Sequence, residues 1–557
     1  MPIASFADPR KICRATRRMY SIPAALAKDA WHNPFELHVK NRRQRNSLYR
    51  AARFGLRLSK QSRTSIFGQP RLSGQGGFSL RVLLVKPRNT TAHFGLAPFF
   101  RTEPLGLEYI ASALAAEGHQ VRIVDMCFER RSMAHFIRSF RPQLVGISCL
   151  HILDAAAMLA HAAEIKAADA SVFVAAGGHS IASYPQAVDG SRDIDAICAG
   201  EGESIMPALC RALATRQPLN EVPSLLLPAG DGRFVPTGAI QPWLEMEHVL
   251  PPDRAAVQRY RKHYVCLNYM PVWTMETTRG CRHRCKFCSV WQFYGATCRY
   301  HAAQHVRQDF AAIGRNVFII DDLFWADKAH SEELASELLA HAERKNWILV
   351  QSRADLVSSN ADLLRRWRPL AKNFDIFFGF ESPTRQGLNS LHKGSDISKT
   401  LDAVRVAREC GFGVTGNFII DPDFTEEDFH TLWDFVETHK LFRLGFTILT
   451  PLPGTQFFAS IQDKIEVFDW SQYDLHHLLW KPRLPVQRFF ELYCETWRRT
   501  VLNSAGRKKW WQWLPQVDLR HIGHLARILA RSQQLMNPHA YMAEYSVPDG
   551  PEPVRQP

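Results

Sequence analysis

Short apolar segments alternate with helical stretches along most of this 557-residue chain, and this alternation constrains its fold more than any other feature. Alternating strands and helices predict a parallel sheet covered by helices. We therefore expect a doubly wound α/β domain at residues 80–220, with ligands bound at the carboxyl ends of its strands. The predicted strands are RVLLVKP (81–87), VRIVDM (121–126), QLVGISCL (143–150), SVFVAAGG (171–178) and DAICAGEGE (195–203).

Glycine-rich turns follow three of these strands, at Gly146 to Cys149, Gly177 to Ser180 and Gly200 to Glu203. Glycine allows the backbone to approach a ligand closely, and the helix N-termini that follow can bind polar groups. The same glycines would also suit tight turns with no ligand. The turns by themselves leave both interpretations open.

Three cysteines in the segment ETTRGCRHRCKFCSVW (276–291) form the sharpest motif of the chain. Cys281, Cys285 and Cys288 stand in C-x3-C-x2-C spacing directly after the strand-like segment YMPVWTMET. Three thiolates from one loop can hold three irons of a [4Fe-4S] cluster and leave the fourth iron open. A zinc site completed by Cys298 is the main alternative, although zinc usually takes two cysteine pairs. A buried structural triplet is a further alternative.

Five more strand-like segments follow the cysteines, with helical stretches between them. Together with the strand before Cys281 they give six βα units, which predict a partial (β/α)6 barrel with functional residues at the carboxyl ends of its strands. The segments are NVFIIDD (316–322), WILVQSR (347–353), FDIFFGFES (374–382), GVTGNFIID (413–421) and GFTILTPLPGT (445–455). The polar residues at these ends are Asp321, Asp322, Arg353, Asp355, Glu381, Ser382, Asn417 and Asp421, followed by Thr450 to Gly454. Each carboxylate could instead serve only as a helix cap or an ion-pair partner.

The net charge of +15 is concentrated at the start of the chain. Residues 1–80 contain sixteen Lys or Arg and three acidic residues, so the rest of the chain is nearly neutral. No nucleic-acid recognition module accompanies this charge, and we expect no nucleic-acid partner. The amphipathic basic segment at 40–63 is either a solvated extension or a contact for an anionic membrane surface. Its Ser/Arg-rich, acid-poor composition also resembles an organelle transit peptide.

Length and composition predict several domains in an intracellular chain. With 46% hydrophobic and 22% charged residues the chain can fold, and it has no apolar run long enough to span a membrane and no recognisable secretory signal. We expect a cytoplasmic protein with peripheral membrane contact as an option. The predicted parts are a basic extension (1–79), the doubly wound domain (80–220), a linker (221–265), the barrel (266–460) and an aromatic-rich helical region (461–557).

Six of the 14 tryptophans lie in that last region, between Trp470 and Trp513, together with Phe489, Phe490 and Tyr493. Aromatic and basic residues in combination suit a boundary between water and lipid. They also suit a helical layer packed on the barrel. The segment at 518–536 predicts an amphipathic helix that packs on a partner or on the core.

The doubly wound domain resembles the cobalamin-binding domain that precedes the catalytic domain in cobalamin-dependent radical S-adenosylmethionine enzymes. PLGLEYIASALAAEGHQVRIVD (104–125), GGHSIASYPQ (177–186) and AGEGES (199–204) carry the resemblance. The Asp-x-His-x-x-Gly motif of many cobalamin domains is absent, which implies a corrin without a lower histidine ligand, although His151 and His179 lie near the predicted pocket. The cobalamin contacts that the resemblance implies are Gly106, Ser148, Gly177, Gly178, His179, Gly200, Glu201, Gly202 and Glu203.

The cysteine motif resembles that of the radical S-adenosylmethionine family. In this family, S-adenosylmethionine chelates the open iron and is cleaved to a 5′-deoxyadenosyl radical. The resemblance implies that Phe287 packs near the adenine, that Arg353 serves the carboxylate and that Glu381 serves the amino or ribose groups. Asp321-Asp322 replaces the Gly-Gly-Glu turn of many relatives, and Ser382 and Asn417 complete the implied S-adenosylmethionine site.

The segment DWSQYDLHHLLWKPRLP (469–485) and the order of domains are similar to those of hopanoid C-3 methylases. This similarity implies methyl transfer to an unactivated carbon of a large apolar lipid, with cobalamin, a [4Fe-4S] cluster, S-adenosylmethionine and an electron donor such as a flavodoxin or ferredoxin. A cobalamin-dependent oxidative cyclase or ring-rearranging enzyme is the alternative within the superfamily. A cobalamin-binding sensor with a structural cluster is the alternative that is not an enzyme.

Overall fold

The computed structural model describes residues 79–88, 94, 99–238, 243–501 and 522–547. The predicted basic extension, apart from Ser79, lies outside the described residues. The chain divides into two units, Met1–Gly77 and Phe78–Pro557, and every described residue belongs to the second.

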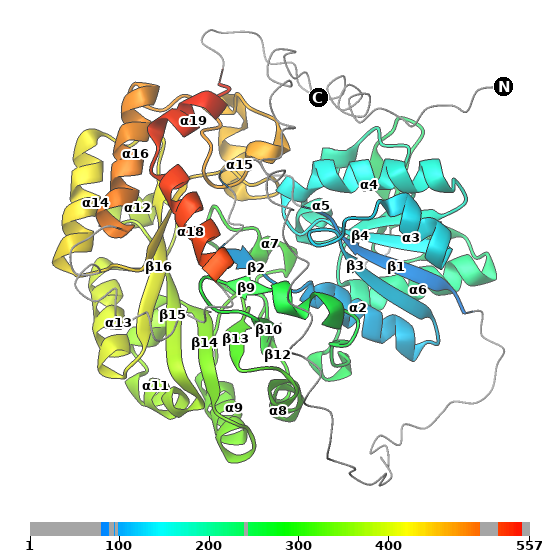
Figure 1. The fold of residues 1–557 in the computed structure, drawn as a ribbon, viewed down its shortest axis with the longest axis horizontal. Helices are drawn as coiled ribbons and strands as arrows, with labels where there is room; N and C mark the ends of the chain where they lie inside the picture. Colours follow the sequence, from blue (N-terminus) through cyan, green and yellow to red (C-terminus); the bar gives the residue numbers. More distant parts are fainter. Residues whose placement is uncertain (1–78, 89–93, 95–98, 239–242, 502–521, 548–557) are drawn as a thin grey trace, which may run out of the picture. The chain divides into compact units, whose positions relative to one another are not determined.

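A seven-stranded sheet forms the first domain, with the strands in the order β3-β1-β4-β5-β6-β7-β8 (Figure 1). Its first five strands in this order are parallel. Most of them are apolar and buried along their length, as in the VLLV centre of β1, because helices cover both faces of the sheet, whereas the first half of β3 is largely exposed. These strands are β1 (Arg81–Lys86), β3 (Gln120–Asp125), β4 (Leu144–Ser148), β5 (Phe173–Gly177) and β6 (Ala196–Cys198).

Two pairs of helices cover the faces of this sheet. Helix α2 (Leu105–Ala116) packs against α6 (Gly202–Thr215), and α3 (Met133–Phe140) packs against α4 (Ala155–Ala168), with the short α5 (His179–Ser183) after β5. Figure 1 shows the two pairs on either side of the strands. The predicted doubly wound fold class is confirmed.

The sheet continues beyond the predicted domain boundary at residue 220. Strands β7 (Leu225–Pro228) and β8 (Phe234–Pro236) form a hairpin whose first strand pairs antiparallel with β6. The sequence analysis assigned these residues to a linker, and the structure corrects this. The two strands are short, and the second is largely exposed, so they give little periodic signal.

Six parallel strands form the second sheet, in the order β10-β13-β14-β15-β16-β17. They coincide with the six predicted βα units and confirm the partial barrel. The strands are β10 (Trp273–Met275), β13 (Asn316–Ile319), β14 (Lys345–Ser352), β15 (Ala371–Glu381), β16 (Gly413–Ile420) and β17 (Leu444–Ile448). The helices are α7 (Val290–Phe293), α8 (Ala303–Ala312), α9 (Lys328–His341), α10 (Ala354–Ser358), α11 (Ala361–Trp367), α12 (Arg385–Ser390), α13 (Ile397–Glu409), α14 (Glu426–Thr438) and α15 (Gln456–Ile461).

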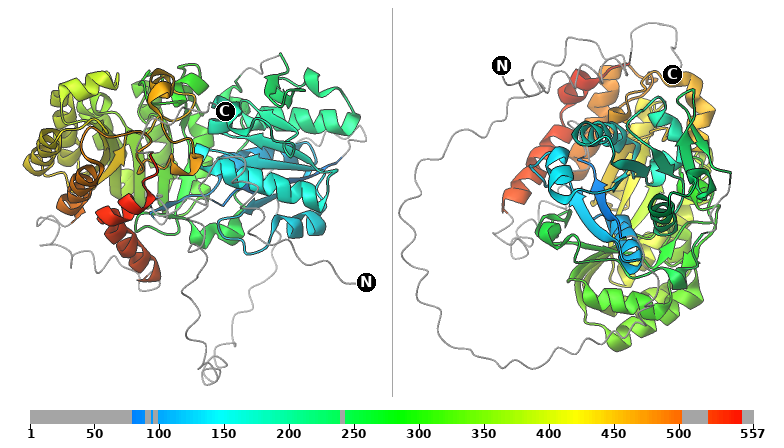
Figure 2. Two further views of the ribbon diagram at one scale, coloured as in Figure 1. Left: turned by 90° about the horizontal axis from the view of Figure 1, so that it is seen from above. Right: turned by 90° about the vertical axis from the view of Figure 1, so that its right-hand side faces the viewer.

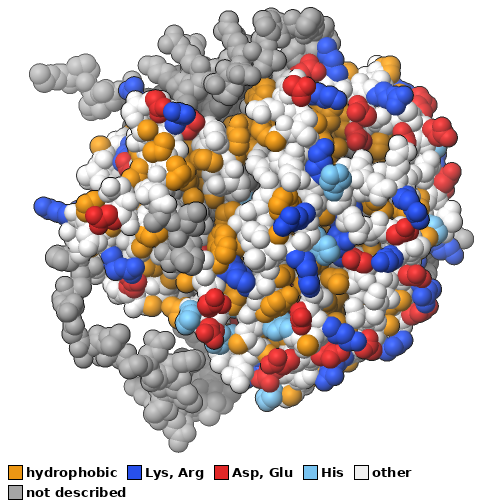
Figure 3. Space-filling model, turned by 180° about the vertical axis from the view of Figure 1, so that it is seen from behind, with side chains coloured by type: hydrophobic (Ala, Val, Ile, Leu, Met, Phe, Trp, Pro, Cys, Tyr) orange, Lys and Arg blue, Asp and Glu red, His pale blue; other side chains and the backbone are white. Residues whose placement is uncertain are grey.

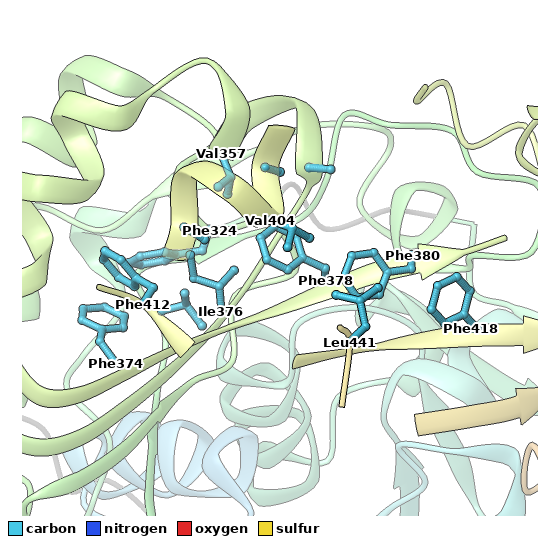
Figure 4. Close-up of a cluster of buried hydrophobic side chains, with 14 of the residues drawn as sticks. Phe324, Val357, Phe374, Ile376, Phe378, Phe380, Val404, Phe412, Phe418 and Leu441 are labelled. Carbon is cyan, nitrogen blue, oxygen red and sulfur yellow. The ribbon is translucent and has the colours of Figure 1, made fainter. Parts of the chain in front are cut away.

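The two faces of each barrel strand have different roles. On β15, Phe374, Ile376, Phe378 and Phe380 are buried in the main hydrophobic core, under the helices (Figure 4). Successive side chains of a strand point to opposite faces. The odd-numbered residues of this strand from Phe377 onward are therefore left for the inner face.

Two short antiparallel pairs link distant segments. Strand β2 (Phe100–Arg101) pairs with β9 (Val265–Cys266), which joins the first domain to the chain just before the barrel. Strand β11 (Thr278–Arg279) pairs with β12 (Arg299–Tyr300) and closes the loop that carries the three cysteines.

The C-terminal helices pack on the barrel. Helix α16 (Val486–Val501) lies against α14 and β17, and α19 (Pro538–Glu544) lies against α16 (Figures 1 and 2). Phe489, Phe490 and Tyr493 belong to the main core, so these aromatics pack on the barrel. Helix α18 (Ile522–Leu535) lies within the predicted amphipathic segment, whereas Trp510, Trp511 and Trp513 lie outside the described residues.

Acidic and basic side chains are interspersed over the face shown in Figure 3, in keeping with the nearly neutral body of the chain. In the part of the chain that the structure describes, every helix is too short or too polar to cross a membrane.

Candidate cofactor and substrate site

A cavity of about 1980 Å³ is lined by the carboxyl ends of both sheets. All nine residues of the first domain that were predicted to contact cobalamin line this cavity. Among the barrel residues predicted to bind S-adenosylmethionine or the cluster, those that line the cavity are Phe287, Cys288, Asp322, Glu381 and Asn417. The structure thus gathers most of the predicted site around one space. The other predicted residues, Cys281, Cys285, Asp321, Arg353 and Ser382, are not part of its lining.

The turn after β5 requires glycine at position 178. Gly178 has φ +109°, and a Cβ atom there would lie 2.7 Å from the backbone oxygen of Cys149. The turns after β4 and β5 therefore approach each other as closely as two backbones can. Both turns line the cavity, so this packing fixes the part of the cavity wall that was predicted to contact cobalamin.

Strand periodicity places the barrel's polar residues. Phe377, Gly379 and Glu381 of β15 line the cavity, and their even-numbered neighbours fill the core. Asn417 lies in the same way on β16, where its amide donates a hydrogen bond of 2.8 Å to Thr447 Oγ1. One face of β15 and one face of β16 thus contribute side chains to the cavity wall.

Glu381 ends β15 in a conformation that a side chain disfavours. Its φ is +62°, in the left-handed region, and it follows an irregularity in the pairing of β15 with β16. Its carboxylate accepts a hydrogen bond of 2.7 Å from Lys393 Nζ. Burial alone would lower the pKa of Lys393, but the neighbouring Glu381 raises it, so the Lys393 side chain stays cationic.

The two aspartates after β13 have different surroundings. Asp321 is buried and accepts hydrogen bonds from the backbone N–H and the hydroxyl of Thr277, four residues before Cys281. Asp322 lines the cavity and accepts a hydrogen bond of 2.9 Å from the Gly280 N–H. Burial raises the pKa of Asp321 to about 7 and that of Asp322 to about 6. Asp321 therefore holds the cysteine loop in place, and Asp322 is the one of the two that can contact a ligand.

Arg353 and Ser382 are engaged within the protein. The Arg353 guanidinium binds Asp355 and donates hydrogen bonds to the backbone oxygens of Lys393, at 2.9 Å, and Gly394, at 3.1 Å. The Ser382 hydroxyl accepts a hydrogen bond from the Thr384 N–H. In this structure both side chains support the loop after Glu381.

The cysteine loop is fixed by its backbone. The Lys286 N–H donates to Leu391 O at 3.2 Å, and Lys286 O accepts from the Phe457 N–H at 2.9 Å. The pKa of Cys288 is raised to about 12 by burial and by the neighbouring thiols of Cys285 and Cys281. Three thiols in C-x3-C-x2-C spacing on one loop supply the ligand type and number that a [4Fe-4S] cluster with one open iron needs.

Among the described residues, no three His, Cys, Asp or Glu side chains form a group that could hold a metal ion. Cys298, the fourth ligand of the zinc alternative, donates its S–H to Gly280 O at 3.2 Å.

A buried charge cluster joins the first domain to the cysteine loop. The Arg279 guanidinium donates to Glu201 at 2.8 Å, to Glu203 at 2.7 Å and to Glu276 at 2.8 Å. Arg299 contacts Glu201 as well, at 2.7 Å. Glu201 and Glu203, predicted to contact cobalamin, thus also bind the segment just before Cys281. Sequence patterns missed Arg279 because nothing local indicates its distant partners.

Two histidines lie near the predicted corrin surface. His179 Nε2 is 2.7 Å from the hydroxyl of Ser289, next to Cys288. Burial lowers the pKa of His179 to about 4, and burial also lowers the pKa of His151. Both imidazoles are therefore neutral at physiological pH.

The C-terminal region supplies a wall of the cavity that the sequence analysis did not predict. Leu475, Trp497, Ile528 and Leu535 all line it. The segment at 469–485, singled out by its resemblance to hopanoid C-3 methylases, was the only available signal for Leu475.

Comparison with known proteins agrees with this geometry. Residues 96–210 match the B12 binding domain, and residues 275–436 match the radical SAM superfamily. The chain joins a B12-binding domain to a radical SAM domain. The predicted family, fold class, enzyme class and cofactors are therefore confirmed: cobalamin, a [4Fe-4S] cluster and S-adenosylmethionine.

Three known proteins illustrate its relationships. The chain is 28% identical over 466 residues to the hopanoid C-3 methylase of Methylococcus capsulatus, covering 81% of this chain and 87% of that protein. It is 25% identical over 447 residues to the anaerobic magnesium-protoporphyrin IX monomethyl ester cyclase of Rubrivivax gelatinosus, covering 76% and 78%. Its fold resembles that of the radical S-adenosylmethionine methyltransferase TsrM from Kitasatospora setae, with a TM-score of 0.58, 19% identity and coverage of 69% and 78%.

Proposed function

We propose that this radical SAM enzyme transfers a methyl group to an unactivated carbon of a large apolar, hopanoid-like lipid. The observation that carries the proposal is the shared cavity, into which the glycine turns of the first domain and the cysteine loop of the barrel both open. A methyl donor, a radical source and the reacting carbon must meet at short range. A single space lined by both cofactor domains supports this arrangement.

The residues have the following proposed roles. Cys281, Cys285 and Cys288 hold the cluster; Phe287, Asp322, Glu381 and Asn417 contact S-adenosylmethionine, and the turns around Gly178 and Gly202 hold cobalamin. When bound, the cluster and S-adenosylmethionine supply a radical that removes a hydrogen atom, and cobalamin supplies the methyl group. Asp321 orients the cysteine loop, and Arg353 and Ser382 support the loop after Glu381.

The apolar substrate is supported by the walls of the cavity away from the glycine turns. Aromatic and aliphatic side chains of the barrel strands and the C-terminal helices face this part, among them Phe318, Phe377, Ile419, Leu444, Trp497 and Ile528. Burying apolar surface would provide most of the binding free energy for such a substrate. The relative named for a hopanoid substrate agrees with this inference.

Anaerobic turnover with methyl-labelled S-adenosylmethionine and a membrane-lipid extract tests the proposal. We expect mass spectrometry to find the label in a lipid product, and we expect none with Cys285→Ala, which removes one thiol of the cluster site. Cleavage of S-adenosylmethionine without any labelled lipid would contradict methyl transfer.

Ring formation or rearrangement is the second candidate, favoured by the relative named as a cyclase. The same assay separates the two, because a cyclase would give a product of altered mass without the label. A cobalamin-binding sensor would consume no S-adenosylmethionine.

We also propose a reducing partner such as a flavodoxin or ferredoxin, and contact between the basic extension (1–79) and anionic lipid. Electrostatic attachment weakens as salt shortens the Debye length. Deletion of residues 1–75 should reduce binding to anionic vesicles at low salt and leave the cofactor domains intact. The domain limits of the sequence analysis, with the hairpin β7–β8 moved into the first domain, remain part of this proposal.

A further inference from the structure

One bulky residue of the cavity wall is held in an unfavourable backbone conformation. Leu475 has φ +70°, in the left-handed region, where a side chain with a Cβ costs free energy. It is half-buried and lines the cavity. Such residues persist only where the surrounding structure holds them, and they concentrate at ligand sites.

Hydrogen bonds hold the backbone of Leu475 and the side chain of the residue that follows it. Its carbonyl oxygen accepts a hydrogen bond of 2.7 Å from the N–H of Ile448, the last residue of β17. The next residue, His476, lies 2.9 Å from the hydroxyl of Tyr493, which donates to Phe446 O at 2.8 Å. The conformation is therefore imposed by the end of the barrel and by α16.

A buried ion-pair chain adds a second support. Asp474 Oδ1 accepts hydrogen bonds from the His476 N–H and from His477, each at 2.9 Å, and His477 Nε2 lies 3.0 Å from Glu544 of α19. Burial alone would lower the pKa of His477, but Asp474 and Glu544 raise it to about 9, so it is cationic at neutral pH. The loop is thus tied to the last described helix.

Apolar residues of the barrel and the C-terminal helices line the cavity together with Leu475 and its chain neighbours Asp474 and His476. Leu444 of β17, Trp497 of α16 and Leu535 of α18 line the cavity and also belong to or pack against the main core. The hydrogen bonds of Asp474 and His476 fix the backbone before and after Leu475, and this leucine with its apolar neighbours offers an apolar surface to a ligand.

We propose that Leu475 is a specificity-determining residue, which the loop Tyr473 to His477 presents to the apolar body of the substrate. The identity of that substrate rests on the proposed function, but the contact itself can be tested without turnover. Two readouts are needed, because a residue that matters only for packing would change stability and leave binding unaltered.

Equilibrium binding of pyrene, a rigid apolar probe, to the cofactor-loaded protein makes this test. Leu475→Asn retains the approximate size of the side chain and tolerates positive φ, but it places an amide in the wall. We expect it to weaken pyrene binding about tenfold, because burial of a leucine surface is worth that much or more. Leu475→Met, which stays apolar, should bind pyrene within about twofold of the native protein.

Lys440→Asn is the matched control, since Lys440 has φ +51° and lies exposed in the turn just after α14, outside the cavity lining. It should leave pyrene affinity unchanged. Should Leu475→Asn fail to fold, Leu475→Gly accepts the same φ and takes its place. Native affinity in the folded Asn or Gly variant, or no measurable pyrene binding by the native protein, would overturn the proposal. Loss of labelled lipid product with this binding pattern intact would count against the proposed function alone.

Discussion

Replacing Arg279 by Gln should destabilise the contact between the two cofactor domains. The Arg279 side chain is only 6% exposed and pairs with Glu201, Glu203 and Glu276. Without the guanidinium, three carboxylates would remain in a poorly solvated place. Arg299 and His301 would still contact Glu201 and Glu276, so the loss is partly compensated.

The expected magnitude follows from the charge balance. Removing one partner of a buried ion pair costs about 3–5 kcal/mol, and the remaining cations favour the lower end. Burial alone would raise the pKa of Glu276, but Arg279 and His301 lower it to about 2 from 4.5. That difference corresponds to about 3 kcal/mol of stability, present above pH 4.5 and lost as the pH falls toward 2. The free energy of unfolding of the native protein should therefore exceed that of Arg279→Gln by about 3 kcal/mol at pH 7.

Urea unfolding followed by circular dichroism measures the loss in the free energy of unfolding. Hydrogen exchange of residues 199–204 and 276–282 shows whether the destabilisation is located at the contact between the domains. Arg279→Lys keeps the charge but loses the fork geometry, so it should fall between native and Gln. The control is Arg405→Gln, whose ion pair with Glu409 is 58% exposed at the arginine and should change stability by less than about 0.5 kcal/mol. If Arg279→Gln and Arg405→Gln unfolded at the same urea concentration, the domain contact would not depend on Arg279.

Cys285→Ala should lose the iron of the anaerobically purified protein, and Cys298→Ala should retain it, as iron and sulfide analysis will show; equal loss in both would point to a fourth protein ligand. Gly178→Ala should lose cobalamin and stability because its Cβ would meet the Cys149 backbone, whereas Gly230→Ala, outside the cavity lining and with no atom within 4 Å of its Cβ, should be mild. Because the pKa of His477 is raised from 6.5 to about 9, its contribution of about 3 kcal/mol is complete below pH 6.5 and lost as the pH rises through 9. The melting temperature should fall over that range in the native protein and not in His477→Gln; parallel curves would contradict the assignment.

The sequence predicted those parts of the fold that have a local signal. The parallel strands of both sheets are largely apolar and bounded by turns, so their sequence pattern reveals them without tertiary information. The hairpin β7–β8 was missed because its two strands are short and are held in the sheet by pairing with β6, a contact that their own residues do not reveal. The ends of strands likewise predicted Asp322, Glu381 and Asn417 at the cavity.

What the sequence left undetermined depends on contacts between distant segments. Arg353 carries a charge at the end of a barrel strand, as a ligand-binding residue would, yet it binds the carbonyl oxygens of Lys393 and Gly394. Leu475 belongs to no recognisable catalytic or binding motif. It reaches the cavity only because the C-terminal region folds against β17. These roles depend on side-chain partners and on long-range packing. Neither produces a periodic pattern that can be recognised in the sequence.

Electron paramagnetic resonance of the reduced protein loaded with both cofactors tests most directly whether one cavity serves both domains. Cob(II)alamin and the reduced [4Fe-4S] cluster are each paramagnetic, and two such centres in one cavity interact through space. We predict dipolar broadening of both signals in the native protein, and an isolated cob(II)alamin signal in Cys285→Ala. Two independent signals in the native protein, identical to those of each cofactor loaded alone, would contradict the shared site.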